Sequence, residues 1–133
     1  MAETGRIDIS EVQVAYRDID MHGFLHSHAY LAYAEAALLQ FWRHRPRVED
    51  EPLFVVRKVE CGYHRGLKLD EIARLTVRID KIGGRSVGFN VLIEVEKELA
   101  ADVEMTWMAA DPESREPAPL PEEIRDWLYQ FLP

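Results

Sequence analysis

The segment Val14–Arg43, VAYRDIDMHGFLHSHAYLAYAEAALLQFWR, decides the fold of this chain of 133 residues. It begins as an alternation of apolar and other side chains and ends as an apolar run rich in alanine. Between these parts lies a short polar turn with two aspartates, three histidines and a glycine. This order predicts a strand, then a turn rich in ionisable groups, then a buried helix.

Val12, just before this segment, and Val14 and Tyr16 at its start occupy alternate positions. Successive side chains of a strand point to opposite faces, so this spacing predicts a half-buried strand over residues 12–16. Residues 1–9 are interpreted as a short leader that joins this strand to the N-terminus.

The helix is predicted to begin near Ser27 or His28 and to end at about Arg43. Ser27 is the expected N-cap, because a serine oxygen can accept a hydrogen bond from a free N–H group of the first turn. The helix is apolar nearly all round, which is typical of a buried helix. Its alanines make it thin enough for a sheet to wrap closely around it.

Four further strands are predicted after the helix, because apolar residues recur at every second position in most of this region. They are expected at residues 54–64, 73–79, 87–95 and 103–109. Gly83-Gly84 marks the turn between the second and third of them, whereas residues 97–100 join the last two without a strong turn residue. Residues 112–121 form a proline-rich linker to a short C-terminal helix. Such alternation predicts an antiparallel sheet with one covered face, and the long helix is its natural cover.

Composition limits the classes of function that fit this chain, which is expected to form one domain over residues 1–133. The formal net charge of −8 argues against a general nucleic-acid-binding protein. The single cysteine, Cys61, excludes an intramolecular disulfide and a zinc site made of paired cysteines. The N-terminal sequence lacks the apolar core of a signal peptide, and no apolar run is long enough to cross a membrane. A cytoplasmic protein without membrane contact is therefore expected.

Two motifs give the segment a family resemblance. The residues Tyr16–Gly23, YRDIDMHG, followed by Tyr30–Glu35, YLAYAE, resemble the signature of the 4-hydroxybenzoyl-CoA thioesterase family of hotdog-fold proteins. Shorter similarities to the same family occur at residues 59–65, 69–71 and 84–86. The resemblance covers residues 12–121, which is most of the chain.

The resemblance implies an α+β hotdog fold, with a five-stranded antiparallel sheet wrapped around one long central helix and a short C-terminal helix beyond it. It also implies a homodimer or homotetramer with the active site at the subunit interface, where the strand after the helix pairs with its copy. The implied activity is hydrolysis of an acyl-CoA thioester to a free acid and CoA. No cofactor is expected, since CoA is part of the substrate.

Asp20 is the catalytic residue that the resemblance implies. A carboxylate beside a thioester can attack the carbonyl carbon directly or deprotonate a water molecule. The oxyanion would be held by free backbone N–H groups at the helix start, at Ser27. Glu35 on the helix is the second acid candidate, with a buried ion pair to an arginine as the alternative. Asp18 and Asp20 also suit a turn, so a purely structural role is the other interpretation, favoured for Asp18.

The phosphates of CoA are expected to bind near Arg85 and Ser86, because the Gly-Gly-Arg-Ser hairpin resembles the place where the family holds them with basic residues. Arg65 is expected to add positive charge there. Arginine binds phosphate well through its bidentate geometry, although a solvated surface charge is the alternative for each basic residue.

The three histidines of the turn, His22, His26 and His28, suggest a metal site, but the family resemblance favours lining of the acyl pocket instead. The segment Phe24–His28 departs from the family pattern, so the acyl group is not predicted. Two other functions remain open at this stage. One is a hotdog hydratase or dehydratase that acts on enoyl thioesters, and the other is a protein that binds acyl thioesters without cleaving them.

Overall fold

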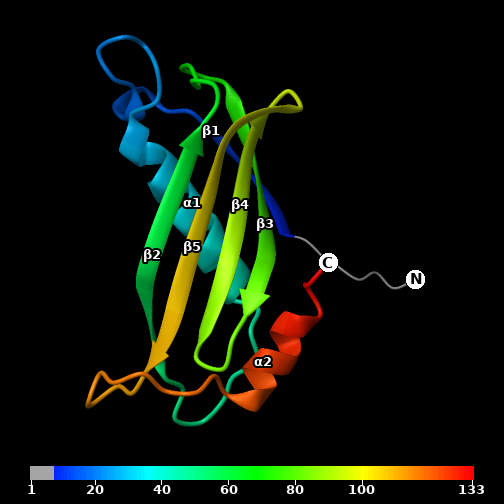
Figure 1. Cartoon of the computed structure of the whole chain (residues 1–133). Helices are drawn as coiled ribbons and strands as arrows, with labels where there is room; N and C mark the ends of the chain where they lie inside the picture. The colour runs from blue at the N-terminus through cyan, green and yellow to red at the C-terminus, as the bar shows by residue number, and fades with distance from the viewer. Residues whose placement is uncertain (1–7) are drawn as a thin grey trace.

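The computed structural model describes residues 8–133 as a curved antiparallel sheet that wraps around one helix (Figure 1). The elements in chain order are β1 (Asp8–Gln13), η1 (Tyr16–Asp18), α1 (Ser27–Trp42), β2 (Leu53–Tyr63), β3 (Ile72–Ile82), β4 (Ser86–Val95), β5 (Glu98–Ala110) and α2 (Glu122–Tyr129). The predicted five-stranded antiparallel sheet, α+β class and short C-terminal helix are thus present. The arrangement is that of a hotdog fold.

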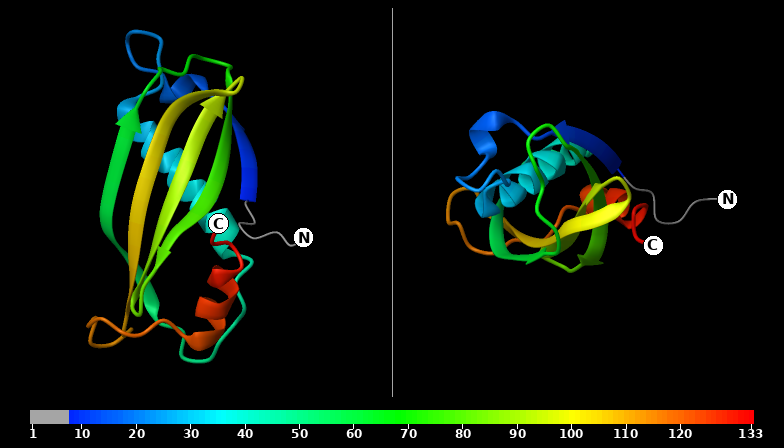
Figure 2. Two further views of the ribbon diagram at one scale, coloured as in Figure 1. Left: turned by 45° about the vertical axis from the view of Figure 1, so that its right-hand side comes forward. Right: turned by 90° about the horizontal axis from the view of Figure 1, so that it is seen from above.

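The sheet order is β1-β3-β4-β5-β2, so β1 and β2 are its two edges. All neighbouring strands are antiparallel. Viewed from above, the sheet curves around α1, and α2 lies at the end of the fold away from the start of α1 (Figure 2). The strand that follows the helix, β2, is therefore an edge with unpaired backbone groups along one side.

The core lies between α1 and the concave face of the sheet. Every second residue of β4 is fully buried, which is the alternation that the sequence predicted. The buried side of α1 faces these residues and consists of Ala29, Tyr30, Ala34, Ala37, Leu38, Phe41 and Trp42. The bounds predicted for the helix agree with the structure to within a residue.

The helix itself differs from the prediction in two respects. It has 16 residues, which corresponds to about 24 Å, so it is of moderate length rather than long. It is also not buried all round, because Glu35, Ala36 and Leu39 lie on an exposed face that the sheet does not reach. A single chain thus leaves an apolar strip of α1 uncovered.

The first strand begins earlier in the chain than the predicted residues 12–16. Residues 1–7 of the predicted leader lie outside the described residues, and β1 already begins at Asp8. The chain leaves the ladder after Gln13, and Tyr16 is 82% exposed at the start of η1. Val14 is nevertheless buried. Its N–H group donates to the Glu71 carbonyl oxygen, and its carbonyl oxygen accepts the Asp70 N–H; both residues lie in the loop before β3.

The turn between β4 and β5 also lies earlier than predicted. Glu96 and Lys97 form it, and both have positive φ angles, of 50° and 70°. Such angles are usually supplied by Asn-Gly or Asp-Gly, so the sequence carried no turn signal at this place. Strand β5 begins directly afterwards, at Glu98.

An aromatic cluster fills the end of the fold where α1 finishes. Trp127 of α2 stacks on Phe41 of α1 with ring centroids 4.9 Å apart. Arg125 donates to the Gly84 carbonyl oxygen at 3.3 Å, and the Leu120 N–H donates to the same oxygen at 2.9 Å. These contacts hold α2 against the β3–β4 hairpin.

None of the helices within residues 8–133 has the length and apolar character that crossing a membrane would require.

Candidate active site

Asp20 lies in a tight turn that its own side chain stabilises. Its Oδ1 atom accepts the backbone N–H groups of His22 at 2.8 Å and Phe24 at 3.1 Å. The Asp20 N–H donates to the Phe24 carbonyl oxygen at 2.7 Å, and Gly23 takes a φ of +86° in the same turn. Glycine adopts this angle without strain, which explains its place in the motif.

The second carboxylate oxygen of Asp20, Oδ2, accepts no hydrogen bond from any residue between 8 and 133. The hydrogen bonds from the Phe24 and His22 N–H groups to Oδ1 lower the pKa of Asp20 below its ordinary value. The side chain is therefore an ionised carboxylate with one oxygen fixed by the backbone and the other available for chemistry.

The start of α1 lies beside this turn. His26 rather than Ser27 is the N-cap, so the prediction of a serine cap is wrong, and Ser27 is the first helical residue. The N–H groups of Ser27 and His28 find no acceptor within the described part of the chain. Free N–H groups at a helix N-terminus attract negative charge, as the predicted oxyanion hole requires.

Asp20 and the helix start line one groove of about 480 Å³. The residues around it are Asp20, Leu25, His26, Ser27, Tyr30, Tyr63, His64, Arg65 and Gly66. The Tyr63 hydroxyl donates to the Ser27 carbonyl oxygen at 2.8 Å, which ties the end of β2 to the first turn of α1. Tyr30 is buried and accepts the Leu67 N–H at 3.0 Å on its hydroxyl oxygen.

Sequence reasoning did not assign Tyr63 and His64 to the site. Both residues stood only within a stretch that resembled the family. Their contribution depends on the end of β2 curling over the start of α1, which no local pattern signals.

Asp18, the other acid of the turn, has a structural role, as predicted, although its partner was not foreseen. Its Oδ2 atom accepts a hydrogen bond from the Tyr33 hydroxyl at 2.9 Å. Its carbonyl oxygen accepts the His26 N–H at 2.9 Å. Asp18 thus links the turn to the body of α1 and fixes where the helix begins.

Burial, followed by the hydrogen bond to Asp18, raises the pKa of Tyr33 to about 12. The unfolded chain loses this proton near pH 10 and the folded chain near pH 12, so stability falls as the pH rises across that interval. We expect Tyr33→Phe to remove this part of the alkaline loss of stability. Urea unfolding at pH 8, 10 and 11.5 measures it, and an unchanged difference between wild type and variant across these values would contradict the assignment.

Arg65 occupies the same groove, but two carboxylates neutralise its charge. Its Nη2 atom lies 2.9 Å from Glu71 Oε2, and its Nε atom lies 3.5 Å from Glu98 Oε1. This pairing joins the segment after β2 to the loop before β3 and to the first residue of β5. The predicted contact of Arg65 with CoA phosphates stays a prediction, and its partners favour a structural role.

Arg85 and Ser86 lie in a second groove, of about 560 Å³, at the β3–β4 hairpin. The other lining residues are Arg57, Lys58, Thr106, Met108 and Pro117. Figure 1 places this hairpin at the opposite end of the sheet from the start of α1. Within one chain, the groove with Arg85 and the groove with Asp20 are therefore apart.

Glu35 lies on the exposed face of α1 and is not part of the groove around Asp20. Within the described residues it has no ion-pair partner, so the interpretation of a buried pair with an arginine is wrong. The physical reason is that the sheet covers only one side of the helix. A catalytic role for Glu35 stays a prediction.

The three histidines of the turn do not converge on one point with other ligands. His26 and His28 stack with ring centroids 5.0 Å apart. Within residues 8–133, no group of three or more His, Cys, Asp or Glu side chains is placed to hold a metal ion. His26 lines the groove around Asp20, as the pocket-lining interpretation requires.

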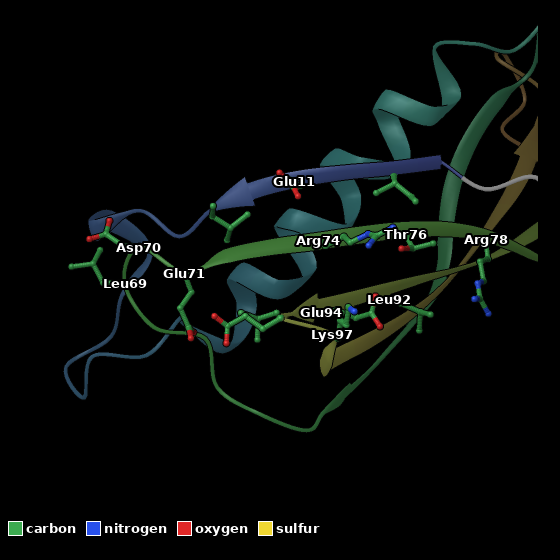
Figure 3. Close-up of a pocket in the computed structure, with 14 residues that line it drawn as sticks. Glu11, Leu69, Asp70, Glu71, Arg74, Thr76, Arg78, Leu92, Glu94 and Lys97 are labelled. Carbon is green, nitrogen blue, oxygen red and sulfur yellow. The ribbon is translucent and has the colours of Figure 1, made fainter.

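A third and wider groove, of about 840 Å³, crosses the outer face of β1, β3 and β4. Figure 3 shows Arg74, Thr76 and Arg78 along β3, with Glu11 on β1 and Glu94 on β4 beside them. Acidic and basic side chains alternate there, and neither Asp20 nor the start of α1 contributes. This groove is therefore separate from the candidate site.

Fold and site together define a hotdog protein with a carboxylate turn at the start of its central helix. The sequence model of the thioesterase-like superfamily matches residues 14–128, and the chain belongs to that family. The family predicted from the sequence and the predicted class of enzyme, a thioester hydrolase, are thereby confirmed. A search of curated protein sequences gave no significant match.

Solved structures of similar fold include several proteins described as thioesterases. YbaW, a probable thioesterase from Escherichia coli, is 20% identical with a TM-score of 0.83, covering 94% of this chain and 98% of the other. A hypothetical protein from Staphylococcus aureus, solved in complex with CoA, is 16% identical with a TM-score of 0.88, covering 100% and 90%. A 1,4-dihydroxy-2-naphthoyl-CoA thioesterase from Synechocystis is 13% identical with a TM-score of 0.81, covering 95% and 96%.

Proposed function

We propose that this protein hydrolyses acyl-CoA thioesters to a free acid and CoA, with Asp20 as the reacting group. The observation that supports the proposal is the pairing of two features in one groove. One feature is an ionised carboxylate with a free oxygen, and the other is a helix start with free N–H groups. The first can attack a carbonyl carbon, and the second can hold the oxyanion that results.

The hydrogen bonds of Asp20 hold one carboxylate oxygen in place and leave the other free, as nucleophilic attack requires. They also lower the pKa of Asp20, which favours the ionised form that attacks. Its ionised form persists at neutral pH, with Oδ2 unencumbered. We infer that Oδ2 attacks the thioester carbonyl, that the C–S bond breaks, and that CoA leaves as the thiolate while a mixed anhydride remains on Asp20.

The groove at the β3–β4 hairpin suits the phosphates of CoA. Arg57, Lys58 and Arg85 bring three cationic side chains to one groove, and Ser86 and Thr106 add hydroxyl donors. The sequence predicted only Arg85 and Ser86 for this role, and Arg57 and Lys58 add two cationic side chains to them. That a protein of this fold was solved with CoA is consistent with this assignment.

A second copy of the chain would bring the two grooves together, and we propose a homodimer for this reason. Edge strand β2 exposes Val56 and Val59, which are 46% and 40% exposed. If two β2 strands pair in antiparallel fashion, the hairpin end of one copy lies beside the Asp20 end of the other. One acyl-CoA molecule would then react at Asp20 while the partner holds its phosphates.

A panel of aryl, short-chain and long-chain acyl-CoAs tests the proposal. We expect stoichiometric release of free thiol and free acid from at least one member, detected with a thiol reagent and by mass spectrometry. Enoyl-CoA converted to a hydroxyacyl-CoA with no thiol release would instead indicate a hydratase. Binding of acyl-CoA without any product would indicate a binding protein, and either result would refute hydrolysis.

A further inference from the structure

The Tyr63 hydroxyl makes a contact with the start of α1 that has no role in the steps described so far. It donates a hydrogen bond to the Ser27 carbonyl oxygen, with an O–O distance of 2.8 Å. Tyr63 is the last residue of β2 and lines the same groove as Asp20. The hydrogen bond therefore links the sheet to the turn of α1 that carries the free N–H groups of the candidate oxyanion hole.

The Ser27 carbonyl group and the His28 N–H group belong to one peptide unit. A peptide unit is planar and trans, so its C=O and N–H bonds point in opposite directions. The His28 N–H finds no acceptor within the described part of the chain, whereas Tyr63 holds the oxygen on the other side of the same plane. A donor that fixes the direction of this carbonyl group therefore also fixes the direction of the His28 N–H.

Few other contacts hold this peptide unit. The N-cap residue, His26, makes no capping hydrogen bond with its side chain. The His26 N–H donates to the Asp18 carbonyl oxygen at 2.9 Å, which fixes an earlier peptide unit. Among the hydrogen bonds of residues 8–133, that of Tyr63 is the one from a side chain to the backbone of Ser27 or His28. Since the ends of helices fray where they lack partners, the aim of the His28 N–H depends on Tyr63.

Tyr63 is itself held in place on two sides. Its backbone is paired with Ala101 of β5 in the ladder. Its ring meets the buried ring of Tyr30 edge-on, with the centroids 5.2 Å apart, and the Tyr30 hydroxyl oxygen accepts the Leu67 N–H at 3.0 Å. Partial desolvation of the hydroxyl raises the pKa of Tyr63 above its ordinary value. The hydroxyl therefore keeps its proton at neutral pH and acts as a donor.

The hydrogen bond also strengthens the N–H group as a donor. Hydrogen bonds in a chain polarise one another, so a peptide unit that accepts a bond at its oxygen donates more strongly from its N–H. A carbonyl oxygen has two lone pairs, so Ser27 can accept Tyr63 and the helical N–H four residues later together. A fixed and polarised donor is what an oxyanion requires, because its charge develops only in the transition state.

We propose that Tyr63 is a positioning residue of the oxyanion hole, which aims and polarises the His28 N–H by donating to the Ser27 carbonyl oxygen. This inference rests on the proposed function, in which Asp20 attacks the thioester carbonyl carbon. As the bond from Asp20 Oδ2 forms, the electron pair of the C=O bond moves to the oxygen, and the His28 N–H stabilises the charge. Tyr63 acts through the peptide unit and does not touch the substrate. Its effect is therefore on kcat and not on KM.

The kinetic test compares wild type with Tyr63→Phe, which removes only the hydroxyl, and with a control, Tyr129→Phe. Tyr129 is 50% exposed and lies on α2, at the end of the fold away from Asp20 (Figure 1). With an acyl-CoA that the wild type hydrolyses, we expect Tyr63→Phe to lower kcat about 10-fold, because loss of a whole oxyanion-hole donor costs about 100- to 1,000-fold. KM should stay within about twofold of wild type. Tyr129→Phe should change neither constant.

Nuclear magnetic resonance of the free protein tests the link to His28 without the reaction. Phenylalanine keeps the aromatic ring, so the shift that the ring causes is preserved and the loss of the hydrogen bond is what remains. We expect the His28 amide proton resonance to move upfield in Tyr63→Phe, because its peptide unit is less polarised. Tyr129→Phe should leave it in place. Circular dichroism and thermal melting establish that both variants are folded.

A Tyr63→Phe variant with the wild-type kcat, or with the His28 resonance unmoved, would overturn the proposal. A raised KM at unchanged kcat would do the same, since it indicates a contact with the substrate. If the wild type cleaves acyl-CoA and Tyr63→Phe is fully active, this inference alone fails. If the wild type cleaves none of the acyl-CoAs, the proposed function fails, and the catalytic role of Tyr63 fails with it.

Discussion

Asp20→Asn is expected to lower kcat for acyl-CoA hydrolysis by about two to four orders of magnitude, the range for loss of an essential acid, base or nucleophile. Asparagine keeps a carbonyl oxygen that can accept the His22 and Phe24 N–H groups, so the turn should be preserved. What the variant loses is the negative charge and the reactive Oδ2 atom. Initial rates of thiol release at saturating substrate measure the effect.

Asp18→Asn is the matched control, because it makes the same change two residues away in the same turn. Asparagine can still accept the Tyr33 hydroxyl, so we expect kcat to stay within about tenfold of wild type, since a neutral hydrogen bond contributes little. Equal losses in the two variants would show that the turn, and not Asp20, determines the rate. Full activity of Asp20→Asn would remove Asp20 from the mechanism altogether.

The strands and the helix were predictable because their patterns are local. The alternation from Val87 to Val95 shows directly which residues of β4 are buried, and the apolar run after Ser27 gives the helix bounds. The pattern did not show that the chain leaves the ladder after Gln13. Hydrogen bonds from Val14 to residues far along the sequence decide that point.

The candidate site was predictable only in its first part. Asp20 and Gly23 belong to one contiguous motif, so the sequence was enough to single out Asp20. The contact of Tyr63 with Ser27 joins residues 36 positions apart, and it depends on how the end of β2 lies against the start of α1. The exposure of Glu35 could not be predicted either, because helical spacing shows which residues share a face of the helix but not which face the sheet covers.

Phe89→Ala is expected to destabilise the protein by about 3–5 kcal/mol, as for loss of a buried phenylalanine side chain. Phe89 is 1% exposed and lies on β4 beneath the end of α1. Its ring centroid is 4.9 Å from that of Trp107 and 6.3 Å from those of Phe41 and Trp42. Removal of the ring would leave a cavity among large, rigid aromatic side chains that cannot easily collapse into it.

Urea unfolding followed by tryptophan fluorescence measures this loss, because Trp42 and Trp107 lie in ring contact with Phe89. Natural domains are stable by about 5–15 kcal/mol, so the variant should unfold at a much lower urea concentration than wild type. Tyr16→Ala is the control, since Tyr16 is 82% exposed and its loss should change stability by at most about 0.5 kcal/mol. A Phe89→Ala variant as stable as this control would mean that the aromatic cluster does not hold α1 against the sheet.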